Sequence, residues 1–238
     1  MNPVELIRFA SDDEVASAVA KDWLELLSRV PADQSRITVA LSGGRVAAKL
    51  FLQTAVVCNG NPSPFQRVHF FWGDERNVPP DSVESNFSSA FDLLLRPLGI
   101  PPSQIHRVPG ELPHADAAAA MEHHIRQWWH RPQPQLPEFD LVLLGMGEDG
   151  HIASLFPGLD AAGESPSHIY VATTGPKPPP QRISLSYPAI ANAREVWVLA
   201  TGQGKQEALR QSLNHGGTPL AKLLRMRKQT RIYTDIPA

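Results

Sequence analysis

The sequence predicts an α/β protein built on a mainly parallel β-sheet with helices on both faces. Segments of strand-like composition alternate with segments of helical periodicity along most of the 238 residues, as expected when each strand returns through a helix. Several predicted strands are continuous apolar runs, which indicates strands buried on both faces. A hydrophobic content of 42% supplies enough apolar side chains for a core, and we expect residues 1–238 to form a single domain.

The first predicted helix begins with a capping signal. Ser11 is followed three positions later by Glu14, which is the spacing of a capping box. Val15, Val19 and Trp23 then recur on one face of a helix that we expect to end near position 29. The other predicted helices cover 46–57, a segment from 86 onward, 115–131 and a segment ending near 214.

The predicted strands are short runs rich in apolar, β-branched and aromatic residues. They cover 36–41, 67–72, 104–108, 139–145, 168–173, 182–186, 195–200 and 231–235, and a proline-rich loop spans 175–180. A parallel sheet of such strands with helices on both sides is a Rossmann-like arrangement. Open sheets of this kind bind ligands at the carboxyl ends of their strands.

Two strand–glycine–helix junctions are typical of sites that bind anions. The strand 36–41 leads into Gly43, Gly44 and Arg45, and the strand 195–200 leads into a glycine-containing turn that ends at Lys205. Free backbone N–H groups and the positive end of a helix converge at such a turn. The alternative is an ordinary tight turn, but Lys205 is expected in the first turn of the following helix, where a cation is unfavourable unless an anion offsets its charge.

Two other predicted strands end in ionisable residues. The strand 67–72 is followed by Asp74 and Arg76, which form either part of a site or a solvated loop with a local ion pair. The strand 139–145 is followed by Asp149 and His151, separated by one glycine. Because the carboxyl ends of parallel strands share one edge, we expect these groups to converge.

The expected convergent set has two chemical classes. Cations and glycine amides suit a phosphate, and carboxylates with an imidazole suit proton transfer. The anion-binding candidates are Gly43, Gly44, Arg45, Arg76, Arg182 and Lys205, and the proton-transfer candidates are Asp74, Asp149 and His151.

His151 is the predicted general base, because an imidazole readily accepts a proton near neutral pH. The alternative is a histidine that caps a helix or fills the core. Asp74 is either catalytic or holds Arg76 in place. The sequence has no Gly-x-Ser-x-Gly nucleophile elbow, so we expect no acyl-enzyme intermediate.

Composition narrows the function classes. The net charge of −2 gives no basic field for nucleic acid, and no apolar run approaches the ~20 residues that span a bilayer. A single cysteine, Cys58, excludes an internal disulfide and fits a cytoplasmic protein. His123 and His124 are expected to be surface or interface residues, and no metal site is predicted. We expect a monomer, with a weak dimer as the alternative.

Four segments together resemble the 6-phosphogluconolactonases of the pentose phosphate pathway. They are ALSGG at 40–44, WGDERNVPPDSVESN at 72–86, DLVLLGMGEDGHIASLFPG at 140–158 and RISLSYPAIANAREVWVLATGQGKQEAL at 182–209. The resemblance implies an α/β fold of the glucosamine-6-phosphate isomerase type. It also implies hydrolysis of 6-phospho-D-glucono-1,5-lactone to 6-phosphogluconate without a metal or organic cofactor, so the expected partner is a small phosphosugar lactone.

The resemblance also implies roles for individual residues. His151 matches the histidine that activates the attacking water, and Asp149 matches a residue that orients it. Arg76 is expected to contact the substrate, and Arg182 and Lys205 are expected near its phosphate. Gly43 and Gly44 match the phosphate loop. One departure follows them: the family continues with Ser-Thr-Pro, whereas this chain has Arg45, Val46 and Ala47. Arg45 then either pairs with the phosphate or points to solvent.

Two alternatives belong to different functional classes. Glucosamine-6-phosphate deaminases resemble the chain around His151, but their loop continues with a glutamate where this sequence has residues 154–157, SLFP. A non-catalytic sugar-phosphate sensor could share the same fold, since fold alone does not fix function. Such a regulator is expected to carry a DNA-binding module before this fold, which we do not expect here, and the retained Asp149 and His151 favour an enzyme.

Overall fold

A six-stranded parallel sheet forms the centre of the molecule. The computed structural model describes residues 4–129, 135–158 and 167–237. The strand order is β1-β9-β8-β5-β2-β3, and every pairing is parallel. The strands are β1 (Val4–Arg8), β2 (Ile37–Leu41), β3 (Val68–Trp72), β5 (Leu141–Gly145), β8 (Glu195–Ala200) and β9 (Thr230–Thr234).

Two of the inner strands, β2 and β5, carry predicted apolar runs. All five residues of β2 are buried, and Val39 lies opposite Phe70 of β3 on one side and Leu141 of β5 on the other. Apolar side chains fill both faces of this part of the sheet, as expected for parallel strands covered on both sides.

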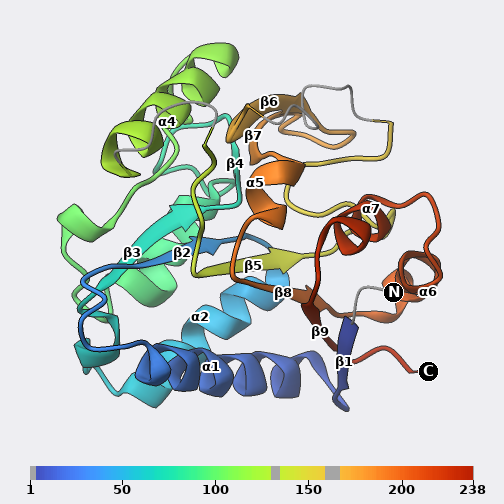
Figure 1. Ribbon diagram of the computed structural model, residues 1–238, viewed down its shortest axis with the longest axis horizontal. Coiled ribbons are helices and arrows are strands. Elements are labelled where there is room, and N and C mark those ends of the chain that lie inside the picture. The colour runs from blue at the N-terminus through green and yellow to red at the C-terminus, as the bar shows by residue number, and fades with distance from the viewer. Residues whose placement is uncertain (1–3, 130–134, 159–166, 238) are drawn as a thin grey trace.

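Two helices cover the lower face of the sheet in Figure 1, α1 (Asp12–Arg29) and α2 (Arg45–Cys58). The predicted cap of α1 is present: the Glu14 N–H donates to Ser11 Oγ at 3.2 Å. The Glu14 carboxylate reaches back one residue further than a standard capping box and accepts from the Ala10 N–H at 3.0 Å. Trp23 of α1 is fully buried and meets Phe65 edge-on.

Three short helices lie toward the opposite side or the right-hand edge of the sheet in Figure 1: α5 (Tyr187–Ala191), α6 (Gln206–Leu213) and α7 (Pro219–Met226). A further short helix, α3 (Asn86–Ala90), continues into a π-helical turn, η2 (Phe91–Leu95). The prediction of an α/β fold with a mainly parallel sheet and helices on both faces is confirmed.

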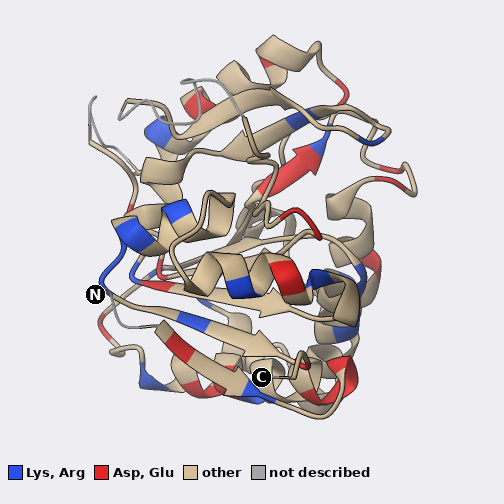
Figure 2. Cartoon of the chain, turned by 90° about the vertical axis from the view of Figure 1, so that its right-hand side faces the viewer, with Lys and Arg blue, Asp and Glu red and all other residues tan. Residues whose placement is uncertain are grey.

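The strands predicted at 168–173 and 182–186 are present, but they form part of a second sheet, above the first in Figure 1, that was not predicted. It is antiparallel, with the order β4-β7-β6, and consists of β4 (Asp74–Arg76), β6 (Tyr170–Thr174) and β7 (Gln181–Leu185). Helix α4 (His114–Trp129) packs against β6 and β7. In Figure 2, β4 is the red arrow with a blue tip, because its sequence is Asp-Glu-Arg. A strand of three polar residues shows none of the apolar alternation from which strands are predicted.

The predicted strand at 104–108 is wrong. The segment begins with a 3₁₀ turn, η3 (Pro102–Gln104), and touches the sheet only through an isolated bridge between Ile105 and Phe70. The His106 N–H donates to the Phe70 carbonyl at 2.8 Å, after which the chain leaves the edge of β3. The elements β1, α5 and α7 were also missed.

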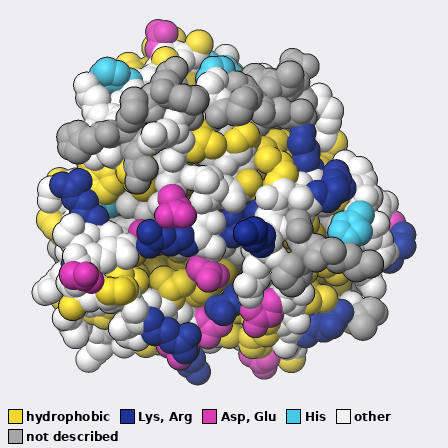
Figure 3. Space-filling view, in the orientation of Figure 1, with side chains coloured by type: hydrophobic (Ala, Val, Ile, Leu, Met, Phe, Trp, Pro, Cys, Tyr) yellow, Lys and Arg dark blue, Asp and Glu magenta, His cyan; other side chains and the backbone are white. Residues whose placement is uncertain are grey.

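Basic and acidic side chains are interspersed on the face shown in Figure 3, in keeping with the net charge of −2. None of the helices in the described segments is both long and apolar enough to cross a membrane.

Candidate active site

All nine predicted site residues line one cavity of about 680 Å³. Its walls come from the turns after β2, β5 and β8, from β4 and the start of α3, and from the loop 176–178. The predicted residues in its lining are Gly43, Gly44, Arg45, Asp74, Arg76, Asp149, His151, Arg182 and Lys205. The expected convergence is therefore found, although β4 and β7 contribute from the second sheet rather than from the ends of parallel strands.

Asp149 orients the imidazole of His151. Its Oδ1 lies 2.5 Å from His151 Nδ1 and 3.1 Å from the His151 backbone nitrogen. Burial raises the pKa of Asp149, but the hydrogen bonds from the His151 N–H and ring outweigh it and hold that pKa below its ordinary value. Because the carboxylate is ionised, the shared proton belongs on Nδ1, and Nε2 is then the acceptor.

The ring of Phe156 packs against His151, with centroids 4.7 Å apart. Phe156 in turn lies against Gly175, where an added Cβ would come within 2.9 Å of the Phe156 ring. Gly175 therefore lets the phenyl ring sit behind the imidazole. Neither Phe156 nor Gly175 was predicted as a site residue, since the contact between them joins chain segments about twenty residues apart.

One end of the cavity is cationic. Gly44 stands at the N-terminus of α2 with φ of 95°, a conformation that glycine adopts freely, so the Gly43–Arg45 turn exposes the helix end. Arg45 Nη2 lies 3.4 Å from the position that a Cβ on Gly202 would occupy. Burial and then the charge of Arg45 lower the pKa of Lys205. Arg45 therefore points toward the second glycine junction and not away from it.

Lys205 departs slightly from its predicted position. It ends a 3₁₀ turn, η5 (Gln203–Lys205), and is the N-cap residue of α6 rather than a member of its first turn. The Glu148 carboxylate also lines the cavity and lies beside Gly204. Two cations thus face the cavity at two helix N-termini, with the carboxylates of Glu148 and Asp235 nearby, an arrangement that suits an anionic group.

Arg76 and Arg182 have protein partners of their own. Arg76 Nη1 lies 3.3 Å from Glu84 Oε2, with the Arg76 side chain about a quarter exposed. Arg182 Nε donates to the Pro179 carbonyl at 2.6 Å, and its Nη2 donates to the Lys177 carbonyl at 3.2 Å. Burial and the charge of Arg76 lower the pKa of Arg182.

Arg182 lies near the start of β7, as expected from the predicted strand 182–186, and there it holds the loop 176–180 against the cavity wall. Lys177 of that loop lines the cavity and was missed, because a lysine in a proline-rich loop carries no distinguishing sequence signal.

Asp74 is buried and does not bond to Arg76. Its Oδ2 accepts from Ser154 Oγ at 2.7 Å, and its Oδ1 faces Asn86 Nδ2 at 3.4 Å. The Asn86 amide also donates to the Asp74 carbonyl at 2.9 Å. Asn86 and Ser154 were missed as site residues, although both lie within the motif segments 72–86 and 140–158.

Two further close contacts support the Gly43–Arg45 turn and the start of α3. A Cβ on Gly43 would lie 1.8 Å from Asn86 Oδ1, so only glycine fits at this position. The buried Glu75 carboxylate accepts from the backbone N–H groups of Arg76, Asn86 and Phe87 and from the Ser85 hydroxyl. Burial raises the pKa of Glu75 against these hydrogen bonds.

Among the described side chains, no three His, Cys, Asp or Glu residues gather as a metal site.

Comparison with known proteins gives a consistent result. The family model for glucosamine-6-phosphate isomerases/6-phosphogluconolactonase matches residues 10–232. The 6-phosphogluconolactonase of Mycobacterium leprae is 36% identical over 219 residues, covering 90% of this chain and 87% of that protein. A probable chloroplastic 6-phosphogluconolactonase 4 of Oryza sativa subsp. indica is 32% identical over 245 residues, covering 98% and 75%.

Solved structures show the same relationship. The 6-phosphogluconolactonase from Trypanosoma cruzi superposes with a TM-score of 0.86 at 27% identity, over 98% of this chain and 95% of that one. A monomeric glucosamine-6-phosphate deaminase has a TM-score of 0.79 at 16% identity, over 97% and 96%, which shows a shared fold. The resemblance found in the motif segments is confirmed, and the chain belongs to the glucosamine-6-phosphate isomerase/6-phosphogluconolactonase family.

Proposed function

We propose that this protein hydrolyses 6-phospho-D-glucono-1,5-lactone to 6-phosphogluconate, with His151 as the general base. The observation that carries the proposal is the His151–Asp149 pair, in which Asp149 engages Nδ1 and leaves Nε2 as the acceptor of a histidine that lines the cavity. The names of the relatives support the same reaction, since several are 6-phosphogluconolactonases at 32–36% identity.

In the proposed mechanism, a water oxygen attacks the lactone carbonyl while His151 Nε2 takes its proton. The resulting tetrahedral intermediate collapses with cleavage of the ring C–O bond, and the imidazolium returns its proton to the leaving oxygen. Asp149 stabilises that imidazolium, because its carboxylate already accepts the Nδ1 proton. General base catalysis of this kind contributes about 10²–10⁴ in rate.

The substrate phosphate is proposed to bind at the cationic end, held by Arg45, Lys205 and the backbone amides of Gly43 and Gly44. Burial and then the charge of Arg45 lower the pKa of Lys205, and a phosphate dianion bound between the two cations would stabilise the charged form of both. Arg45 then supplies by charge what the hydroxyls of the family's Ser-Thr-Pro sequence supply by hydrogen bonds. Arg76, Arg182 and Lys177 are proposed to face the remaining polar groups of the sugar acid.

Lactone hydrolysis fits the loop after His151 better than deamination. Residues 152–158 read IASLFPG and contain no carboxylate that could assist ring opening. The reducing compartment proposed for such an enzyme is in keeping with the single, buried and unpaired Cys58.

The test is a coupled assay of 6-phosphogluconate formation, measured above the spontaneous rate of lactone opening. His151→Ala is expected to lower kcat by about 10²–10⁴-fold. Arg45→Ala and Lys205→Ala are expected to raise KM, with smaller effects on kcat. Glucosamine 6-phosphate serves as the control substrate, and no acceleration of lactone opening by the unaltered protein would refute the proposal.

A further inference from the structure

The loop that carries His151 is fastened to the second sheet through one residue, Ser154. Three polar groups of Ser154 each bond to a different strand of that sheet. Its N–H donates to Ser184 Oγ of β7 at 3.2 Å, and its carbonyl accepts from Thr173 Oγ1 of β6 at 3.0 Å. Its hydroxyl donates to Asp74 Oδ2 of β4 at 2.7 Å.

These contacts lie in the protein interior. Ser154 is 1% exposed and Asp74 is 7% exposed, and Ser184 and Thr173 are buried as well. Buried hydrogen bonds of this kind are shielded from water, and an unmatched partner left behind would carry a full desolvation penalty. The three contacts therefore fix Ser154 tightly relative to the second sheet.

The backbone between His151 and Ser154 contains one strained residue. Ala153 has φ of 46°, in the left-handed region that is unfavourable for a residue with a Cβ. Such a conformation persists only where neighbouring contacts hold both sides. On one side, the His151 carbonyl accepts from the Gly147 N–H at 2.9 Å, and on the other side Ser154 is held by the sheet.

Asp74 is therefore in a position to hold the loop and not to transfer protons. One carboxylate oxygen accepts the Ser154 hydroxyl, and the other faces Asn86, whose amide also bonds to the Asp74 backbone. The carboxylate thereby joins the start of α3 to the His151 loop across 80 residues of sequence.

We propose that Asp74 and Ser154 form a clasp that positions His151 for the reaction, with Asp74 acting as a hydrogen-bond acceptor rather than as an acid or base. The inference rests on the proposed function, in which His151 is the base. It reassigns Asp74 from the proton-transfer group in which the sequence placed it to a positioning residue.

The charge of Asp74 and its acceptor role are separable by substitution. Asp74→Asn keeps an oxygen that can accept from Ser154 and loses only the longer, 3.4 Å contact with Asn86. Asp74→Ala and Ser154→Ala each remove the clasp. Thr54→Ala is the matched control, because Thr54 is also a buried hydroxyl, bonded within α2 to the Leu50 carbonyl.

Steady-state lactone hydrolysis is measured for these variants and for the double variant Asp74→Ala/Ser154→Ala. Each single alanine variant is expected to lower kcat about tenfold and to keep KM within about twofold of the unaltered protein. The double variant is expected to lower kcat no further than either single variant does. Asp74→Asn is expected to keep kcat within about threefold, and Thr54→Ala should leave kcat unchanged. Equal losses for Asp74→Asn and Asp74→Ala would overturn the proposal, as would an unchanged kcat in Ser154→Ala.

A second readout does not depend on lactonase activity. The imidazole signals of His151 are followed by NMR as a function of pH and identified by their absence in His151→Gln. Ser154→Ala and Asp74→Ala are expected to shift the midpoint of this titration, whereas Asp74→Asn is expected to leave it unchanged. An unshifted midpoint in Ser154→Ala would refute the clasp even if the lactone is not the substrate. If Ser154→Ala does not fold, Thr173→Val removes only the hydroxyl that holds the Ser154 carbonyl, and the same outcomes apply.

Discussion

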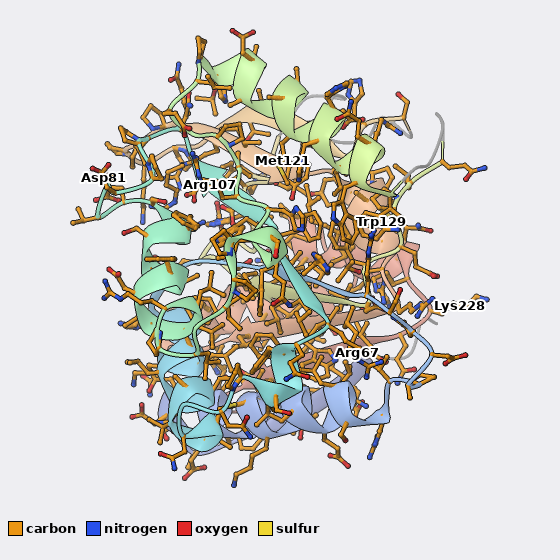
Figure 4. All side chains as sticks on the ribbon, turned by 90° about the vertical axis from the view of Figure 1, so that its left-hand side faces the viewer. Arg67, Asp81, Arg107, Met121, Trp129 and Lys228 are labelled. Atoms are coloured by element: carbon orange, nitrogen blue, oxygen red, sulfur yellow. The ribbon has the colours of Figure 1, made fainter. Side chains whose placement is uncertain are left out.

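A row of three histidines outside the cavity predicts a specific loss of stability in mild acid. His69 Nδ1 lies 2.9 Å from His106 Nε2, and His106 Nδ1 lies 2.9 Å from His124 Nε2. The row joins β3 to α4, the helix labelled at Met121 and Trp129 in Figure 4. His106 is buried and stacks on Phe71 with ring centroids 4.5 Å apart. His124 itself lies at the surface, as predicted.

The surroundings of His106, the central ring of the row, disfavour its protonation. Burial first, and then positive charge at His124, His69 and Arg36, lower the pKa of His106 from 6.5 to about 3. Below pH 6.5 the unfolded chain therefore binds a proton at this position that the folded protein does not bind. The resulting contribution to stability is complete above pH 6.5 and is lost as the pH falls toward about 3.

The expected loss of stability follows from the size of the pKa shift of His106. Each pH unit below 6.5 removes about 1.4 kcal/mol, so this histidine alone lowers the free energy of unfolding by about 2 kcal/mol between pH 7 and pH 5. That loss is a considerable fraction of the stability of an ordinary domain.

The measurement is urea unfolding at pH 7 and pH 5 for the unaltered protein, for His106→Phe and for His123→Gln. Phenylalanine keeps the stacking on Phe71 but does not titrate, so the pH-dependent loss is expected to shrink by about 2 kcal/mol. His123 is exposed and lies outside the row, and its variant is expected to retain the full loss. The same pH dependence in all three proteins would refute the reasoning.

Three substitutions around the cavity test its close contacts. Gly43→Ala is expected to raise KM for the lactone and to lower the free energy of unfolding in urea by about 1–3 kcal/mol. Its Cβ would lie 1.8 Å from Asn86 Oδ1 and displace the Asn86–Asp74 hydrogen bond. Gly217→Ala is the control, because a Cβ at that position meets open space. Gly175→Ala is expected to lower kcat more than it raises KM, since its Cβ would push the Phe156 ring against His151, and an unchanged kcat would show that Phe156 does not support the imidazole. Ala153→Gly is expected to stabilise the fold by about 0.5 kcal/mol, because relief of the left-handed conformation outweighs the added freedom of the unfolded chain; a lower thermal midpoint would contradict this.

Local patterns in the sequence predict the first sheet well. The apolar runs of β2 and β5 and the cap at Ser11 are signals carried by neighbouring residues, and each element forms close to its predicted position. The convergence of His151 and Lys205 on one cavity follows from the same strands, because parallel strands bring their carboxyl ends to one edge.

The second sheet could be predicted only in part, since β6 and β7 were expected as strands but their antiparallel pairing and β4 were not. Its strand β4 is three polar residues, and it is a strand only because Asp74 lies opposite Ser184, more than a hundred positions away. The same is true of single side chains. Charge marks Arg182 as a phosphate candidate, but only the fold shows that its guanidinium holds the carbonyls of the loop 176–180.

The two sheets differ in how well the sequence predicts them, and they also contribute different parts of the site. The parallel sheet supplies the helix N-termini and glycine turns that suit a phosphate, and those signals are local. The antiparallel sheet supplies the Ser184, Thr173 and Asp74 groups that hold Ser154, and those contacts are distant in sequence. The loop after β5 belongs to both, since it leaves the first sheet at Gly145 and is fastened to the second at Ser154. The separation between the proposed phosphate cations and His151 is therefore set by how the two sheets pack. A substitution that shifts one sheet against the other should change kcat without altering any residue that contacts the substrate.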